Sequence, residues 1–254
     1  MNAPLVVGNW KMNCGPKASL DLLRKISHQL QKRPAPAQVA VAPPFTSLLA
    51  AKKVVEKAGI ELAAQNCHWQ DSGAFTGEIS PAMLREIGCG LVIVGHSERR
   101  HILGESDNMI SQKVVAVIRH GMRPVLCVGE TIEERKDEQT SAVIERQLDS
   151  ALKGIGEDAI DKVDIAYEPV WAIGTGLNAT VEQICETHTQ IRKFLISRFD
   201  KATGERARIL YGGSVKADNA EMIARTELVN GFLVGGASLI AESFLQIVQA
   251  FSVK

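Results

Sequence analysis

Eight short apolar segments recur along this chain, and they constrain its fold more than any other feature. Each is continuously apolar rather than alternating, which is typical of strands covered on both faces and therefore of a parallel sheet. They occupy residues 5–7, 39–42, 60–64, 91–94, 125–128, 163–167, 209–211 and 232–234. Between them lie segments with apolar residues at helical spacing, such as Leu20, Leu23, Ile26 and Leu30, or Ile110, Val114, Val117 and Ile118.

Eight strand–helix repeats in 254 residues predict an α/β fold, a closed (β/α)8 barrel in which each of eight parallel strands is followed by a helix. An open doubly wound sheet is the alternative. It is disfavoured because eight parallel strands in this length leave no residues for a separate cap. No Pro/Ser-rich linker or low-complexity stretch divides the chain, so residues 1–254 are predicted to form a single domain.

Two sequence signals place helix starts. Thr131 with Glu134 and Thr180 with Gln183 have the spacing of capping boxes, and they are predicted to open the two longest helices. The last helix is expected to start near Ser238. Three histidines fall in helical segments and are expected at the surface: His28, His120 and His188.

Charge and cysteine content exclude several classes of function. The 29 basic and 29 acidic residues balance, so we expect no nucleic-acid partner and no binding to an anionic membrane. The five cysteines are scattered and never form a CxxC, which argues against a disulfide framework or a zinc site. No signal peptide and no apolar run of membrane-spanning length is found, and a cytoplasmic location is expected.

Polar and glycine-rich residues gather directly after the predicted strands. In a barrel of this kind, catalytic residues lie at the carboxyl ends of the strands, so a site is predicted there. The residues that follow strands one, four, six, seven and eight are Gly8–Lys11, Gly95–Arg100, Glu168, Gly212–Ser214 and Gly235–Gly236.

The segment after strand six is unusual. Pro169 restricts Glu168 to an extended backbone, which limits the directions of its carboxylate. Residues 171–173 are apolar and precede Gly174 and Gly176, whose permissive dihedrals suit a hinge. The segment is interpreted as a catalytic base beneath a lid. An ordinary strand-to-helix turn with a solvated glutamate explains these residues equally well.

Seven motifs, in order along the whole chain, resemble triosephosphate isomerases. They are GNWKMN (8–13), AQN with SGAFTGE (64–78), GHSERR (95–100), CVGET (127–131), YEPVWAIGTG (167–176), YGGSV (211–215) and GFLVGGASL (231–239). The resemblance implies a TIM barrel and a glycolytic and gluconeogenic isomerase that interconverts dihydroxyacetone phosphate and D-glyceraldehyde 3-phosphate through an enediolate. Such a reaction requires neither a redox cofactor nor a metal.

The resemblance also implies roles for four catalytic residues. Glu168 is the expected base for the carbon-bound proton. His96 is the expected electrophile and proton shuttle, and a short helix beginning after it disfavours the imidazolium form. Lys11 supplies a positive charge and Asn9 an amide donor to the substrate oxygens. Ser97 and Glu98 are expected to support the site, with Glu98 as partner of Lys11, and Arg99 to be structural.

The substrate phosphate is expected on main-chain N–H groups. Gly213 and Ser214 after strand seven, and Gly235 and Gly236 after strand eight, allow close approach of an anion. Gly174 is expected to add one N–H group when the lid closes. Glycines that serve only tight turns are the alternative for either pair taken alone.

The segment 65–78 is long for a barrel loop. The resemblance implies that it inserts into a second subunit near that subunit's Asn9 and Lys11, forming a homodimer with Cys14 close by. The expected contact residues are Gln65, Phe75, Thr76, Gly77 and Glu78. A mobile surface loop is the alternative. The chain departs from the family pattern at Asn230, where Asp is usual, and at Leu103, where Phe is usual.

Two other functions fit a fold of this class. An aldolase acting on a phosphorylated sugar needs a lysine at a strand end for a Schiff base, but strand six ends in Glu168. A binding protein without activity predicts a damaged set of catalytic residues, but Asn9, Lys11, His96 and Glu168 are all present. The isomerase is therefore the favoured prediction.

Overall fold

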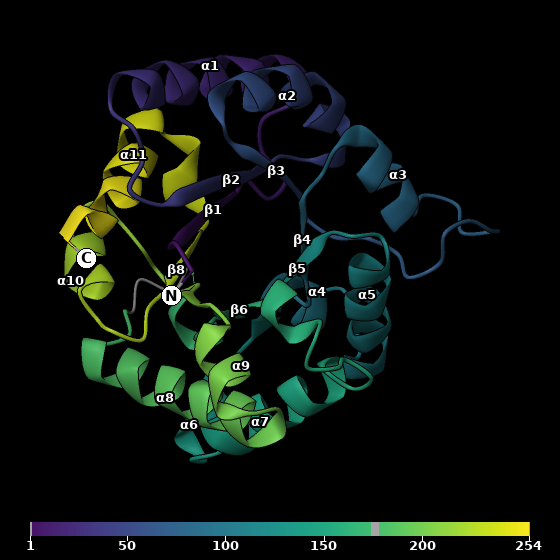
Figure 1. The fold of residues 1–254 in the computed structure, drawn as a ribbon, viewed down its shortest axis with the longest axis vertical. Helices are drawn as coiled ribbons and strands as arrows, with labels where there is room; N and C mark the ends of the chain where they lie inside the picture. Colours follow the sequence, from purple (N-terminus) through teal and green to yellow (C-terminus); the bar gives the residue numbers. More distant parts are fainter. Residues whose placement is uncertain (1, 174–177, 254) are drawn as a thin grey trace.

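Eight parallel strands close into a barrel in chain order (Figure 1). The computed structural model describes residues 2–173 and 178–253. Strand β1 pairs with both β2 and β8, which closes the ring and confirms the predicted (β/α)8 barrel. The strands are β1 Leu5–Asn9, β2 Gln38–Ala42, β3 Glu61–Ala64, β4 Leu91–Val94, β5 Arg123–Val128, β6 Asp164–Tyr167, β7 Ile209–Tyr211 and β8 Gly231–Val234.

Helices surround the strands as an outer ring (Figure 1). The α-helices are α1 Pro16–Lys32, α2 Phe45–Ala58, α3 Pro81–Ile87, α4 Ser97–His101, α5 Asp107–Arg119, α6 Ile132–Lys136, α7 Thr140–Ala151, α8 Val181–Arg198, α9 Lys201–Arg206, α10 Ala220–Ala224 and α11 Ala241–Gln249. Short 3-10 turns are η1 Ile160–Lys162, η2 Val170–Ala172, η3 Gly236–Leu239 and η4 Ala250–Val253. None of the helices in the described part of the chain combines the length and apolar character needed to cross a bilayer.

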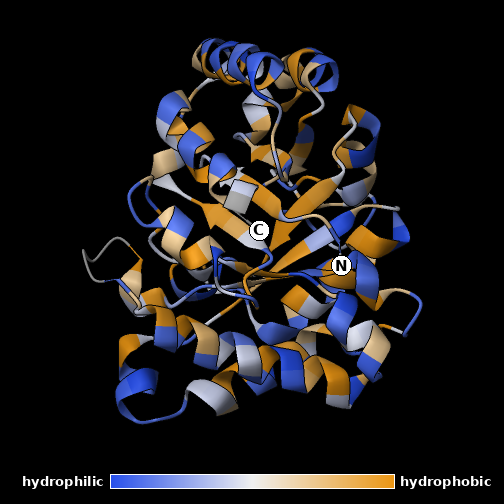
Figure 2. Ribbon diagram, turned by 60° about the vertical axis from the view of Figure 1, so that its left-hand side comes forward, coloured by the Kyte–Doolittle hydropathy of each residue, from blue (hydrophilic) through white to orange (hydrophobic). Residues whose placement is uncertain are grey.

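The strands bury apolar side chains on both faces. Along β1, Leu5 and Val7 belong to a cluster inside the barrel, whereas Val6 packs into the larger cluster between strands and helices. This alternation follows from the pleat of a strand, which sends successive side chains to opposite faces. Because each face meets an apolar layer, the strands are continuously apolar, and Figure 2 shows them mostly orange inside a ring of mixed helices.

Some local predictions were wrong. The Thr131 capping box forms, with both hydrogen bonds in place, but it opens the five-residue helix α6 rather than a long one. Glu138 adopts φ +57°, and this left-handed residue separates α6 from α7. The Thr180 capping box opens α8, as predicted. The last α-helix starts at Ala241, because Ser238 lies in the 3-10 turn η3.

One histidine prediction also needs correction. His188 on α8 is fully buried, not at the surface, and its Nδ1 lies 3.1 Å from the carbonyl oxygen of Leu228. Its ring meets the edge of Tyr167 at the end of β6, with ring centroids 6.0 Å apart. His188 does lie in a helix, as predicted, but it is on the face of α8 that packs against the barrel.

A buried ionic cluster joins α5 to the loop after β3. Lys113 is 2% exposed and donates to Glu105 and, at 3.0 Å, to Asn66 Oδ1. Arg99 donates to the same Glu105 carboxylate. Burial alone would raise the pKa of Glu105, but its bonds to Lys113 and Arg99 outweigh burial and hold that pKa below the usual 4.5. Burial lowers the pKa of Lys113, an effect that Glu105 opposes.

Replacing this carboxylate should produce a pH-dependent loss of stability. Because the folded-state pKa of Glu105 is depressed, its contribution is fully present above pH 4.5 and is lost as the pH falls through the folded-state value. Glu105→Gln should therefore cost about 3–5 kcal/mol of unfolding free energy at pH 7, since it leaves Lys113 buried without its anion. Urea unfolding at pH 7 and at several values below 4.5 measures the penalty.

The penalty should shrink in the acidic samples. Glu86→Gln, which alters an exposed glutamate on α3, serves as the control and should leave stability unchanged at every pH. A Glu105→Gln penalty that is constant across the whole pH range would contradict the assignment of this carboxylate as the charged partner of Lys113.

Candidate active site

A cavity of about 300 Å³ lies at the carboxyl ends of the strands. Its lining comes from the ends of β1, β4, β6, β7 and β8, as the strand-end pattern predicts. The lining residues are Asn9, Lys11, His96, Glu168, Ile173, Gly212, Gly213, Ser214, Val215, Lys216, Leu233, Gly235, Gly236 and Ala237. A larger groove of about 710 Å³ lies between α1, α10 and α11, but no residue of a strand end lines it.

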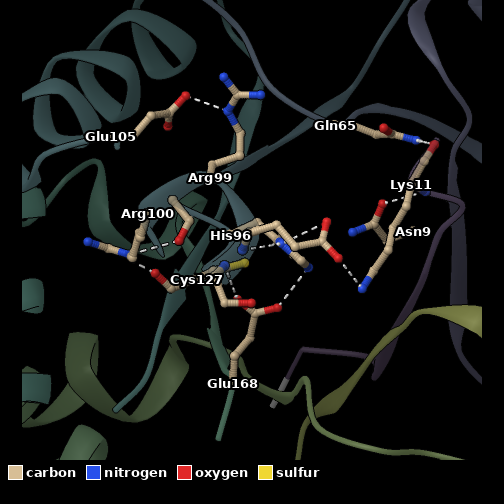
Figure 3. A network of polar contacts seen from close by, with 12 residues as sticks. Asn9, Lys11, Gln65, His96, Arg99, Arg100, Glu105, Cys127 and Glu168 are labelled. Atoms are coloured by element: carbon tan, nitrogen blue, oxygen red, sulfur yellow. Dashed lines mark hydrogen bonds and ion pairs between the residues drawn. The ribbon is translucent and has the colours of Figure 1, made fainter. Parts of the chain in front are cut away.

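Glu168 follows β6 and is almost completely buried. Its main-chain N–H donates to the carbonyl of Val128 at 2.8 Å, which continues the pairing of β5 with β6. Its carboxylate faces the start of α4. Oε2 accepts the main-chain N–H of Ser97 at 2.9 Å, and Oε1 lies 3.0 Å from Nε2 of His96 (Figure 3).

His96 is held in one tautomer by the start of α4. It is the N-cap residue of this helix, and its Nδ1 accepts the main-chain N–H of Glu98 at 3.2 Å. A ring nitrogen that accepts a hydrogen bond carries no proton, so the neutral ring has its proton on Nε2. That N–H points at the carboxylate of Glu168. The imidazole can therefore donate from Nε2 while remaining uncharged.

Asn9 and Lys11 leave β1 in a constrained turn. Lys11 adopts φ +51°, which is uncommon for a residue with a side chain. The Asn9 Oδ1 accepts the Lys11 main-chain N–H at 3.1 Å, and the Gln65 side chain donates to the Lys11 carbonyl at 2.8 Å (Figure 3). The Lys11 ammonium lies 2.6 Å from Oε1 of Glu98. The turn thus aims one cation and one amide into the cavity.

The turns after β7 and β8 bring main-chain N–H groups to the cavity. Within the described residues, the N–H groups of Ser214 and Gly235 have no protein acceptor. The carbonyls of the same two residues are engaged by side chains, since Asn219 donates to Ser214 and Ser238 donates to Gly235. Such turns suit an anion. Gly174, predicted to contribute another N–H, lies outside the described residues.

The residues predicted to contact a second subunit separate into two groups. Gln65 folds inward, and its Nε2 also donates to the carbonyl of Ala42. Residues 76–78 are exposed, and the Phe75 ring packs on His68 with centroids 4.3 Å apart. The loop between β3 and α3 extends outward past the helical ring (Figure 1).

Sequence reasoning missed Glu130, a fully buried carboxylate after β5. Its Oε1 accepts from the Tyr167 hydroxyl at 3.1 Å, and from Trp171 Nε1 and Arg135 at 2.9 Å each. Burial and the Glu130 charge both raise the pKa of Tyr167. Glu130 therefore links the end of β5 to residues on both sides of Glu168. Its position in CVGET at a strand end was the available signal.

Arg100 and Cys127 were also missed, and both bond to groups next to the site. Both lie in motifs that the sequence analysis names, Arg100 in Gly95–Arg100 and Cys127 in CVGET, but neither lines the cavity and no role was predicted for either. Among the described residues, no three His, Cys, Asp or Glu side chains come together as a potential metal site.

Comparison with known proteins agrees with this geometry. A (β/α)8 barrel with a carboxylate, an imidazole and a lysine lining one cavity at its carboxyl end is typical of enzymes that move protons on a small substrate. Residues 4–251 match the family model described as "Triosephosphate isomerase". The chain belongs to the triosephosphate isomerase family, and it is an isomerase that interconverts dihydroxyacetone phosphate and D-glyceraldehyde 3-phosphate.

Similar proteins match along nearly the whole length of both chains. A triosephosphate isomerase of Aquifex aeolicus is 51% identical over 247 residues, covering 97% of this chain and 99% of the relative. One from Carboxydothermus hydrogenoformans is 46% identical, and one from Thermoanaerobacter pseudethanolicus is 44% identical, each covering 98% of this chain and 99% of the relative. The resemblance inferred from the motifs is thereby confirmed.

The packing of Gly212 against Glu168 gives a test of the site geometry. A Cβ at this position would lie 2.9 Å from Cγ of Glu168 and 3.2 Å from the Tyr167 carbonyl. Gly212→Ala should displace the carboxylate and lower kcat by about 10²-fold, the effect typical of a misplacement near 1 Å. Gly15→Ala is the control, because a Cβ there meets no atom within 4 Å. Equal kcat values for both variants in a steady-state assay would contradict this packing argument.

Proposed function

We propose that Glu168 is the base of the isomerisation and that His96 is its electrophile. Both side chains are buried and line the same cavity as Asn9 and Lys11. The observation that carries the proposal is the hydrogen bond from Glu98 N–H to His96 Nδ1, since it keeps the proton of a neutral ring on Nε2. An imidazole in this state can donate its proton to one substrate oxygen and later take up the proton of the neighbouring hydroxyl oxygen.

The proposed reaction transfers protons between neighbouring carbons and oxygens. Glu168 removes a proton from the carbon beside the substrate carbonyl, and the carbonyl oxygen gains charge as an enediolate forms. The Nε2–H of His96, the Asn9 amide and the Lys11 ammonium stabilise that charge. Glu168 then delivers its proton to the former carbonyl carbon. Nε2 of His96 gives its proton to the former carbonyl oxygen and takes up the hydroxyl proton of the neighbouring oxygen, which becomes the new carbonyl oxygen. To reach the substrate carbon, the Glu168 carboxylate gives up the bonds to Ser97 and His96.

The phosphate group of the substrate is proposed to bind at the turns after β7 and β8. The N–H groups of Ser214 and Gly235 support this placement, together with Gly213 and Gly236 in the same lining. Lys216 adds a positive charge to that side of the cavity. Binding of the non-reacting phosphate can supply energy that orients the reacting carbons.

Two substitutions test the proposed roles. Glu168→Gln and His96→Gln should each lower kcat in a coupled assay with either triose phosphate, because one removes the base and the other the Nε2–H donor. Positioned proton transfer contributes about 10²–10⁴-fold, so losses of that size are expected. Near-parent kcat in both variants would refute the assignment. Thermal unfolding of the variants distinguishes lost chemistry from lost structure.

We also propose that two copies of this chain form a homodimer through the loop after β3. Ten large apolar side chains are exposed among the described residues. Seven of the ten fall within residues 12–103, between the β1–α1 turn and the residues that follow α4: Met12, Phe45, Leu49, Phe75, Met83, Ile102 and Leu103. Concentrated exposed apolar side chains mark association surfaces. Residues 76–78, which follow Phe75 in the same loop, are exposed as well.

Sedimentation velocity tests the dimer. The parent should sediment at twice the monomer mass, and Phe75→Glu should shift it toward the monomer, because a buried unpaired charge opposes association. Ile240→Glu places the same charge on an exposed isoleucine away from these segments and should leave the dimer intact. A parent that remains monomeric at micromolar concentration, or equal dissociation of both variants, would contradict the proposed surface.

We further propose that residues 1–254 act as one domain in a reducing cytoplasm, without nucleic-acid or membrane partners. All five cysteines are unpaired thiols. Burial raises the pKa of Cys67 and of Cys89 to about 12, so these two thiols are unreactive at neutral pH. A chain with this cysteine distribution is suited to a compartment that keeps thiols reduced.

A further inference from the structure

Arg100 connects three segments that meet behind the proposed acid–base pair. Its side chain is 8% exposed, and its guanidinium is bonded in three directions (Figure 3). Nε donates to the carbonyl of Gly95 at 2.8 Å, and Nη2 donates to the carbonyl of Cys127 at 3.0 Å. Nη1 lies 2.6 Å from Oδ1 of Asp107 at the start of α5. One planar group therefore bonds to the ends of β4 and β5 at once.

The bond to Gly95 acts on His96 through a shared peptide unit. The Gly95 carbonyl and the His96 N–H belong to one planar peptide unit. A hydrogen bond that holds the carbonyl therefore also holds the main-chain nitrogen and Cα of His96 in place. Gly95 itself adopts φ +72°, a conformation that only glycine takes readily. A Cβ at Gly95 would lie 3.0 Å from Nη2 of Arg100, so the guanidinium packs directly against this turn.

The bond to Cys127 acts on Glu168 in two ways. The next carbonyl along β5, that of Val128, accepts the main-chain N–H of Glu168. The Cys127 thiol also lies against the Glu168 carboxylate, and its pKa is raised by burial and by that negative charge. Cys127 thus contacts Arg100 through its main chain and Glu168 through its side chain.

We infer that Arg100 is a positioning residue that sets the separation between Nε2 of His96 and the carboxylate of Glu168. The inference rests on the catalytic roles proposed above for those two residues. Arginine suits this task because its rigid fork of donors reaches two carbonyls and a carboxylate together. Lysine also has three donors, but they share one nitrogen, so it cannot reproduce the three separate positions from which Nε, Nη1 and Nη2 donate.

A simpler role for Arg100 would be to stabilise α5 through Asp107, and the chain contains a matched control for it. Arg146 on α7 donates to the other oxygen of Asp107 but has no bond to Gly95 or Cys127. Arg100→Lys and Arg146→Lys both perturb the Asp107 ion pairs. Only Arg100→Lys removes the bonds to the two strand ends. A difference between these variants therefore isolates the positioning role.

The test combines steady-state kinetics with NMR of histidine ring nitrogens. Arg100→Lys should lower kcat by about 10–100-fold, the range expected for a small misplacement of reacting groups. The KM and the inhibition constant of inorganic phosphate should stay unchanged, because the turns after β7 and β8 are not touched. The His96 ring signals should move in Arg100→Lys and not in Arg146→Lys. Arg100→Ala should regain kcat when guanidinium ion is added.

Three results would overturn the inference: an equal fall in kcat for both lysine variants, an unmoved His96 signal in Arg100→Lys, or no rescue of Arg100→Ala by guanidinium. The NMR measurement does not depend on activity. If Glu168→Gln and His96→Gln were to retain activity, the proposed function would fail, while the ring signals would still report whether Arg100 positions His96. Thermal unfolding of each variant before assay confirms that a folded protein is compared.

Discussion

Closure of the eight-stranded ring is the constraint on which the rest of this structure depends. Once β8 pairs with β1, each strand is covered on both faces, and charged side chains are confined to the strand ends. Strand β6 shows the consequence at both ends. Asp164 at its start is paired with Arg208, although burial still raises the Asp164 pKa, and Glu168 follows its last residue. The ion pair at the start of β6 joins this strand to the residue before β7, and the carboxylate after its last residue lines the cavity.

This constraint explains why so much of the fold could be predicted from sequence. All eight apolar segments are strands, with ends that shift by at most two residues, because continuous hydrophobicity is a direct result of two-sided burial. The strand-end positions of Asn9, His96 and Glu168 predicted that they would lie together, and all three line one cavity. The length of the helix that Thr131 opens was predicted wrongly, because the left-handed backbone conformation of Glu138 separates α6 from α7. The surface position predicted for His188 was also wrong, because its burial depends on how α8 packs.

The residues that sequence reasoning missed act through partners far along the chain. Arg100 bonds to the carbonyl of Cys127, and Glu130 accepts from Tyr167 and Trp171, which are 37 and 41 positions away. Every residue has a main-chain carbonyl, so the residue type of the partner does not reveal that its carbonyl accepts a hydrogen bond from a distant side chain. Such contacts become visible only when the strand register places the two segments together.

Glu98 shows why the proposed acid–base site depends on α4 as much as on the strands. Its carboxylate pairs with the Lys11 ammonium, while its main-chain N–H donates to His96 Nδ1. Because Nδ1 of His96 accepts this N–H, the proton of a neutral ring lies on Nε2, which faces the Glu168 carboxylate. Lys11 and His96 are thus both held in place by Glu98, one through its carboxylate and the other through its main-chain N–H.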